Sequence, residues 1–139
     1  MLIRIAAVVC LAAMLSGCGG VSSPSDNQSE TFTGTVTSTQ SSGPTPGAGP
    51  IHTFNVGKVG EFFVTITALA PDQNIFVGVV FGQLVSGGCT QNQVNPAAHL
   101  NTQAAGGQIE KGTWCVQVFD VGQVSPTTPT SYSLRVSHP

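Results

Sequence analysis

Positive charge is scarce in this sequence of 139 residues, which has four lysine and arginine side chains against six aspartates and glutamates. The basic residues are scattered along the chain and form no stripe or cluster. A protein that binds nucleic acid needs such a basic surface to attract phosphate groups. The composition therefore excludes nucleic acid as a partner.

Motifs for catalysis are also missing. The sequence has no Gly-x-Ser-x-Gly elbow and no His-Glu-x-x-His pair. His52, His99 and His138 are separated from one another and from the cysteines, and we expect each to be an ordinary surface or partly packed histidine. Few acid–base sets can be assembled from these residues, so the sequence predicts a protein that is not an enzyme.

No apolar run is long enough to remain in a membrane. The longest, residues 5–15, follows a short segment with one positive side chain, Arg4. As a helix it would be about 16 Å long, roughly half of a hydrocarbon core. It is apolar all round, which argues against an amphipathic helix of the folded domain. Residues 1–17 are therefore predicted to be the helical signal peptide of an exported protein.

The end of this segment, Leu15-Ser16-Gly17-Cys18, resembles the lipobox of bacterial lipoproteins. The resemblance implies signal cleavage between Gly17 and Cys18. It also implies acyl chains on the thiol and on the new amino group of Cys18, and hence a membrane anchor at the cell envelope. Gly19 differs from the aspartate of an inner-membrane retention signal, so the expected location is the outer membrane if the source has two membranes.

Residues 18–29 contain few apolar side chains and no periodicity, so they cannot bury enough surface to offset the entropy of ordering. We interpret them as a flexible tether. Residues 30–139 then form a single domain. Without Arg4 the exported chain has three basic and six acidic side chains, a net charge of −3.

The cysteine count predicts a disulfide. Cys10 leaves with the signal peptide and Cys18 carries lipid, so Cys89 and Cys115 remain as a pair in an oxidising compartment. A metal site and a reactive thiol are the alternatives. No histidine has the spacing of a second metal ligand, which favours the disulfide over a metal site.

The folded part alternates with period two, the pattern of half-buried strands. We expect Trp114, Val116 and Val118 on one face of a late strand, with Cys115 opposite, and Tyr132 and Leu134 inward on the last. About seven to eight short strands indicate an all-β, antiparallel β-sandwich. The expected strands include residues 31–37, 51–56, 62–69, 75–81, 108–109, 113–120 and 131–137.

Two late segments resemble the closing hairpin of the bacterial pre-peptidase C-terminal (PPC) domain. They are Gly-Thr-Trp-Cys-Val-Gln-Val at 112–118 and Ser-Tyr-Ser-Leu-Arg-Val at 131–136. Residues 72–77, Asp-Gln-Asn-Ile-Phe-Val, resemble the acidic turn and apolar strand of that family. The resemblance covers about residues 30–139. It implies a jelly-roll-like β-sandwich that accompanies secreted peptidases as a non-catalytic accessory.

Some members of that family bind Ca²⁺ through acidic turns, which makes Asp72 and Asn74 candidate ligands. A calcium site takes six to eight oxygen ligands and usually several carboxylates, so one aspartate and one asparagine form a poor set. The alternative is an Asx turn, in which the Asp72 side chain accepts a hydrogen bond from the local backbone. We therefore expect no bound cofactor.

Three functions remain open for the domain. The first is a non-catalytic accessory or binding domain with a possible protein partner in the envelope. The second is a carbohydrate-binding module, which normally needs exposed aromatic rings. The only tryptophan and the only tyrosine, Trp114 and Tyr132, fall on predicted core faces, so this ranks below the first. A small envelope enzyme ranks third.

Overall fold

The structure is a computed structural model that describes residues 22–43 and 45–139. The predicted signal peptide, the cleavage site at Gly17 and the lipidated Cys18 lie outside the described residues. Among the residues that are described, no helix has the length and apolar character needed to cross a bilayer.

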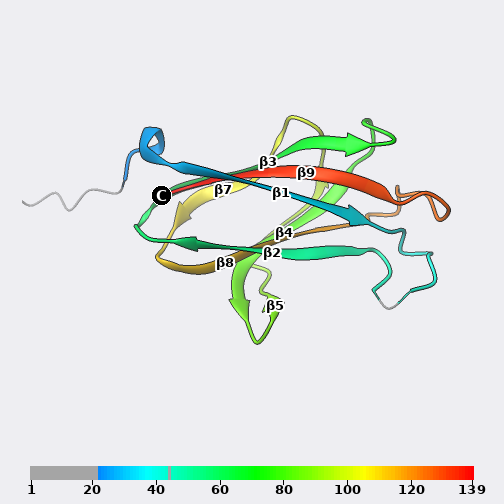
Figure 1. Ribbon diagram of the computed structural model, residues 1–139, viewed down its shortest axis with the longest axis horizontal. Helices are drawn as coiled ribbons and strands as arrows, with labels where there is room; N and C mark the ends of the chain where they lie inside the picture. Colours follow the sequence, from blue (N-terminus) through cyan, green and yellow to red (C-terminus); the bar gives the residue numbers. More distant parts are fainter. Residues whose placement is uncertain (1–21, 44) are drawn as a thin grey trace, which may run out of the picture.

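The protein is an antiparallel β-sandwich, as predicted (Figure 1). One sheet has the strand order β1-β9-β3-β7, and the other has β2-β8-β4-β5 with β6 also paired to β4. Consecutive strands mostly alternate between the sheets, which gives the jelly-roll-like arrangement expected. The strands are β1 (Gln28–Val36), β2 (Ala48–Val56), β3 (Gly60–Ala70), β4 (Val77–Val85), β5 (Gly88–Cys89), β6 (Gln93–Ala98), β7 (Gln103–Ile109), β8 (Gly112–Phe119) and β9 (Thr130–His138).

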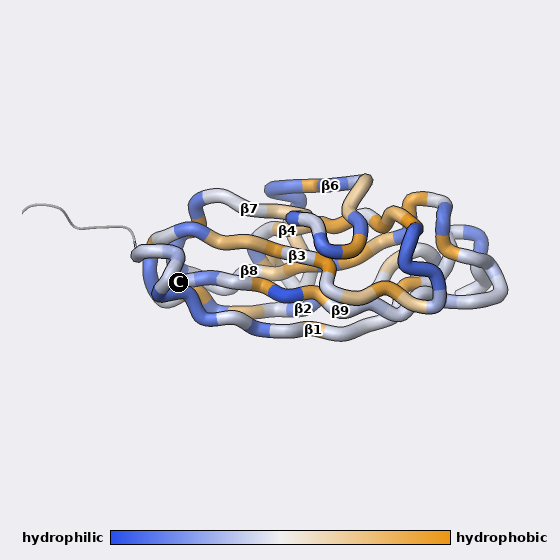
Figure 2. The backbone as a smooth tube through the Cα atoms, turned by 90° about the horizontal axis from the view of Figure 1, so that it is seen from above, coloured by the Kyte–Doolittle hydropathy of each residue, from blue (hydrophilic) through white to orange (hydrophobic). Residues whose placement is uncertain are grey.

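The core lies between the inner faces of the two sheets. Its centre is a stack of aromatic rings, in which the Phe81 ring lies 4.0 Å from the ring of Phe62 and 5.2 Å from that of Trp114. Each such side chain stabilises the fold by about 1.5–3 kcal/mol when it leaves water. In Figure 2 the most hydrophobic colour follows β3 and β4, whereas the edge strand β1 is pale.

The sequence prediction of seven to eight strands missed part of one sheet edge. The irregular stretch expected at 82–101 contains the end of β4 and two short strands, β5 and β6. Both short strands pair with β4: β6 pairs with the first half of β4, and β5 pairs with its end. They therefore share one edge of the sheet. The Gly residues and Pro96 of this stretch concealed the strands, because both residue types are rare in strand interiors.

One predicted strand face also needs correction. Regular alternation along the predicted strand 62–69 puts Ala68 on the same face as Ile66, and Leu69 on the other face. The register of β3 against β9 shifts between Ile66 and Ala68. An extra residue at such a bulge reverses the alternation that follows it. Leu69 is therefore buried and Ala68 is exposed.

Edge strands of both sheets contain residues that weaken strand pairing. Pro50 lies in β2 and Pro96 in β6, each at the edge of its sheet. Gly106 and Gly107 lie in β7, an edge of the other sheet.

The chain joins the domain earlier than predicted. Strand β1 begins at Gln28, and the 3-10 helix η1 (Pro24–Asp26) precedes it. The backbone N–H of Ser22 donates to the Val59 carbonyl at 3.1 Å, and Ser22 forms a parallel bridge with Gly60. The interpretation of 18–29 as a flexible tether is therefore wrong for residues 22–29. Hydrogen bonds of the backbone and of the Asn27 side chain attach this segment to the domain. The low apolar content of the segment gave no sign of them.

The sandwich has two distinct ends. Residues 22–27, 57–59 and 110–111 and the C-terminus lie together, because β1 starts opposite His138 and β3 starts opposite Ile109. We call this the termini end. The opposite end, here the loop end, is formed by the connections at 37–43, 45–47, 71–76, 99–102 and 120–129. In Figure 1 the termini end lies on the left, where the C-terminus is marked, and the loop end lies on the right.

Candidate binding surface at the loop end

Asp120 fixes two of the loops at this end. This residue is 4% exposed and lies just after β8. One carboxylate oxygen accepts the backbone N–H groups of Gly122, Gln123 and Val124 at 2.8–2.9 Å. The other accepts the backbone N–H of Thr39 at 2.9 Å and its hydroxyl at 3.2 Å, from the β1–β2 connection.

These hydrogen bonds also determine the charge of Asp120. Burial by itself raises the pKa of a carboxyl group, but the N–H donors of Thr39 and of residues 122–124 outweigh burial and lower the pKa of Asp120 below its ordinary value. The side chain is thus a fixed anion that accepts from two loops, which makes it a structural residue of the loop end.

An open hollow of about 340 Å³ lies beside these loops and is lined by Gln73, Asn74, Phe76, His99 and Leu100. Phe76 is 39% exposed, although most large apolar side chains of the protein are buried. The ring of His99 meets it edge-on, with centroids 5.4 Å apart. The hollow therefore offers an aromatic surface surrounded by amides and an imidazole, with no charged side chain in its lining.

Hydrogen bonds from three connections hold this hollow in shape. The backbone N–H of Phe76 donates to the side-chain oxygen of Gln123 at 2.8 Å. The hydroxyl of Thr102 donates to the His99 carbonyl at 2.7 Å. His99 Nδ1 lies 3.2 Å from the Leu100 carbonyl oxygen, which can only accept, so the proton of the neutral ring belongs on Nδ1 and Nε2 is an acceptor.

Of the two candidate calcium ligands, Asn74 lines this hollow, and Asp72 lies two residues before it in the chain. Asp72 Oδ1 accepts the backbone N–H of Asn74 at 2.8 Å, which is the Asx turn given as the alternative. Across residues 22–43 and 45–139, no group of three or more His, Cys, Asp or Glu side chains is placed to hold a metal ion. The structure thus gives Asp72 a local role in the turn.

A larger hollow of about 670 Å³ lies along β1 and β2 near the same end. Thr35, Thr37, Ser41 and Gln117 contribute polar groups to it, and Gly49 and Pro50 form part of its wall. It contains no aromatic side chain. Of the two hollows, only the one beside Phe76 offers a ring on which a ligand can stack.

No protein-family model, curated protein or solved structure matches this chain. The lipobox and the resemblance to the PPC domain therefore remain predictions.

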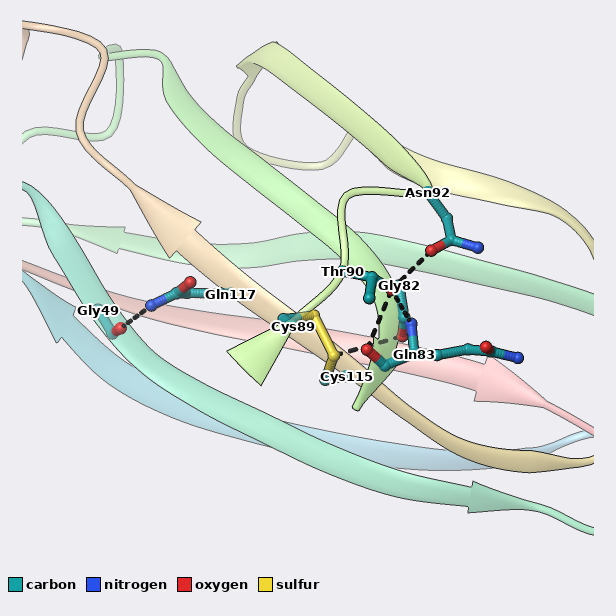
Figure 3. The surroundings of a disulfide bond; sticks show 8 residues. All are labelled: Gly49, Gly82, Gln83, Cys89, Thr90, Asn92, Cys115 and Gln117. Atoms are coloured by element: carbon teal, nitrogen blue, oxygen red, sulfur yellow. Dashed lines mark hydrogen bonds between the residues drawn. A yellow bond between two sulfur atoms is a disulfide. The ribbon is translucent and has the colours of Figure 1, made fainter. Parts of the chain in front are cut away.

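The disulfide between Cys89 and Cys115 is present, as predicted. The two Cα atoms are 5.7 Å apart, within the range of a bridged pair. Cys115 has no exposed surface, and it lies opposite Gly82 of β4. Its sulfur, which carries no proton in the bridge, contacts the Gly82 carbonyl oxygen at 3.3 Å. Figure 3 shows the bridge beside Gly82.

The β4–β5 hairpin reaches Cys115 because two local features allow it. Ser86 and Gly87 at its turn both have positive φ, as a tight type I′ turn requires. Thr90 then packs against Gly82, where any Cβ would collide with the Thr90 carbonyl. The backbone N–H of Gln83 donates to the Thr90 hydroxyl at 2.7 Å. Glycine at position 82 therefore permits the close approach that brings Cys89 over the sheet.

The other two histidines lie away from the loop hollow. His52 Nε2 is 2.9 Å from the Tyr132 hydroxyl, and its ring stacks on Phe32 at 5.1 Å. Burial lowers the pKa of His52 and raises the pKa of Tyr132 to about 12. Both side chains are therefore neutral at pH 7, and the pair is a neutral hydrogen bond.

His138 corrects one expectation. We expected a surface or partly packed histidine near the C-terminus, but its side chain has no exposed surface. Its Nε2 lies 2.9 Å from Glu30 Oε1, and its ring packs 4.9 Å from that of Phe54. The register of β1 on β9 brings Glu30 and His138 together across 108 positions of sequence, so no local pattern could reveal the pair.

Two aromatic residues lie where the sequence placed them. Trp114 is 7% exposed and donates its indole N–H to the Glu110 carbonyl at 2.9 Å, and Tyr132 is 2% exposed. Sequence reasoning instead missed Phe76, because it placed this residue within a strand expected to be apolar on both faces. Strand β4 begins only at Val77, which leaves Phe76 in the loop.

Proposed function

We propose that this chain is a lipid-anchored cell-envelope protein with a non-catalytic binding domain, in the outer membrane if the source has two membranes. The disulfide supports this most strongly. Such bonds persist in exported proteins and are rare in the cytosol. The bridge Cys89–Cys115 therefore supports the export that the predicted signal peptide implies.

The contacts of the ionisable groups support a domain without catalysis. Asp120 accepts five hydrogen bonds from two loops, His138 is buried against Glu30, and Tyr132 stays protonated at neutral pH. General acid–base catalysis needs a group that is accessible and titrates near the working pH. These groups instead hold strands and loops together. In this proposal the domain binds a protein partner in the envelope through the loop end.

Lipidation can be tested by replacing Cys18. Metabolic labelling of cells with a radioactive or clickable fatty acid should label the wild-type chain, and C18A should lose the label and normal processing. Two or three acyl chains give stable anchoring, so the wild type should also float with membranes while C18A does not. The matched control is C10A, which changes a cysteine within the predicted signal peptide and should remain labelled. A labelled C18A protein would refute the proposed anchor.

Carbohydrate binding is the second candidate, and the exposure of Phe76 favours it. A sugar ring stacks its C–H face on an aromatic side chain, while hydroxyl groups bind amides and imidazole. The hollow at the loop end supplies these groups through Phe76, Gln73, Asn74 and His99. Its uncharged lining fits a neutral saccharide. In this candidate function the protein is lipid-anchored as in the first, and its ligand is a glycan of the envelope.

The test is to replace Phe76. If glycans bind in this hollow, F76A should weaken binding to purified peptidoglycan or soluble glucan about tenfold, a loss of about 1.4 kcal/mol. Isothermal titration or a sedimentation assay measures this, and the melting temperature should change little because the side chain is partly exposed. V94A is the control, since Val94 is 47% exposed but lies outside the hollow. Equal binding by wild type, F76A and V94A, or no binding at all, excludes the glycan function.

A further inference from the structure

The chain is fastened to the domain at Ser22, at the termini end. The Ser22 N–H donates to the Val59 carbonyl at 3.1 Å, and the side-chain amide of Asn27 donates to the Glu61 carbonyl at 2.8 Å. Gly60 has no side chain, and a Cβ there would collide with Ser22 and Pro139. This close approach fixes the entry point of the chain beside the C-terminus.

Little chain is left between this point and the proposed lipid. Cys18 and Ser22 are four residues apart, so their Cα atoms can be separated by at most about 14 Å. Strand β1 alone, with its nine residues, is roughly 26 Å long. The distance available to the anchor is therefore at most about half the length of β1.

We infer that this short connection holds the termini end against the polar surface of the bilayer and directs the loop end away from it. The inference rests on the proposed lipidation of Cys18. A flexible tether of twelve residues would let the domain rotate freely, but one of four residues attached at Ser22 keeps the termini end within about 14 Å of the acylated residue. The hollow beside Phe76 and the loops fixed by Asp120 then face the interior of the envelope, where a partner can reach them.

The chemistry of the termini end fits contact with phospholipid headgroups without insertion. Its exposed charged side chains are of both signs, with Lys58 and Lys111 among the basic ones and Asp26 and Glu110 among the acidic ones. Of the exposed large apolar side chains, Phe76 lies at the loop end and Val94 lies opposite Val80 of β4. Val85, at the end of β4 nearer the termini end, belongs to the separate β4–β5 hairpin. A mixed polar surface has little affinity of its own for a membrane. The connection to Cys18, and not attraction of the surface, therefore sets the orientation.

The experiment uses the full lipidated protein in vesicles of phosphatidylethanolamine and phosphatidylglycerol that contain a headgroup-attached spin-label quencher. Cys89 and Cys115 are bridged and the Cys18 thiol would be acylated, so an introduced cysteine is the free thiol for a fluorophore. K58C places the fluorophore at the termini end, and T128C places it at the loop end. We expect strong quenching for K58C and little for T128C.

A variant with a longer connection tests why the quenching of K58C and T128C differs. An insertion of about twelve Gly and Ser residues between Val21 and Ser22 adds roughly 19 Å of average reach. We expect this insertion to remove the difference between K58C and T128C. Equal quenching at the two positions without the insertion, or an unchanged difference with it, would overturn the orientation. Mass spectrometry of the same samples separates the two proposals, because a chain without acyl groups refutes the anchor as well.

Discussion

Removal of the disulfide is expected to lower the free energy of unfolding by about 2–4 kcal/mol, measured on the double variant C89A/C115A. The bridge closes a loop whose ends are 26 positions apart and holds the β4–β5 hairpin over Gly82. Without it the unfolded chain gains conformational freedom. Cys89 and its short strand also lose the link to β8. The double variant avoids an unpaired thiol that would react in an oxidising solution.

Urea or thermal unfolding measures the effect, and a melting temperature lower by roughly 10–20 °C is expected for a domain of this size. Wild type treated with a reducing agent should approach the same value, which is the internal control. V85A, at an exposed residue of the same hairpin, should unfold close to wild type. A double variant as stable as wild type would show that the bridge does not stabilise the fold.

Replacement of Asp120 is expected to have an effect of similar size. D120A removes an acceptor of five hydrogen bonds and leaves buried N–H groups without a partner, which should cost about 2–4 kcal/mol. D120N keeps the shape and one acceptor oxygen, so it should lose less. D72A is the matched control, because exposed Asp72 accepts one backbone hydrogen bond and its loss should cost about 0.5–1 kcal/mol.

The pH dependence of stability provides a second measure of Asp120. Its pKa is lower in the folded than in the unfolded protein, so the unfolded chain binds the proton more readily. Its contribution is therefore complete above the unfolded pKa of about 3.9 and is lost as the pH falls toward the folded pKa. D120N should remove this part of the acid-induced loss of stability in unfolding curves between pH 5 and 2. The same pH dependence in wild type and D120N would contradict the assigned role.

The sequence predicted the strands best where alternation is regular and the inner face is apolar. Trp114, Val116 and Val118 in β8 and Leu134 in β9 lie inside as expected. The bulge in β3 was invisible because it depends on how two strands pair, and alternation describes one strand alone. The short strands β5 and β6 were missed for a related reason. They are held by β4 and by the disulfide, and little in their own residues favours extended structure.

The candidate site was harder to predict than the disulfide. With Cys10 assigned to the predicted signal peptide and Cys18 to the predicted lipid anchor, Cys89 and Cys115 were the pair left, and their bond required no knowledge of the fold. The hollow beside Phe76 combines residues from two connections that are more than twenty positions apart, and only the topology brings them to one end. Asp120 did leave a local signal, since an aspartate before Val-Gly-Gln is typical of a side chain that caps a turn.

The prolines at the sheet edges have a consequence for chains held close together. An open edge strand offers unpaired N–H and C=O groups to which another molecule can add a strand, and repetition of that step produces fibrils. Pro50 in β2 and Pro96 in β6 each lack the N–H that such an addition needs. The edges at β2 and β6 are therefore poor templates for the addition of a strand from a neighbouring copy.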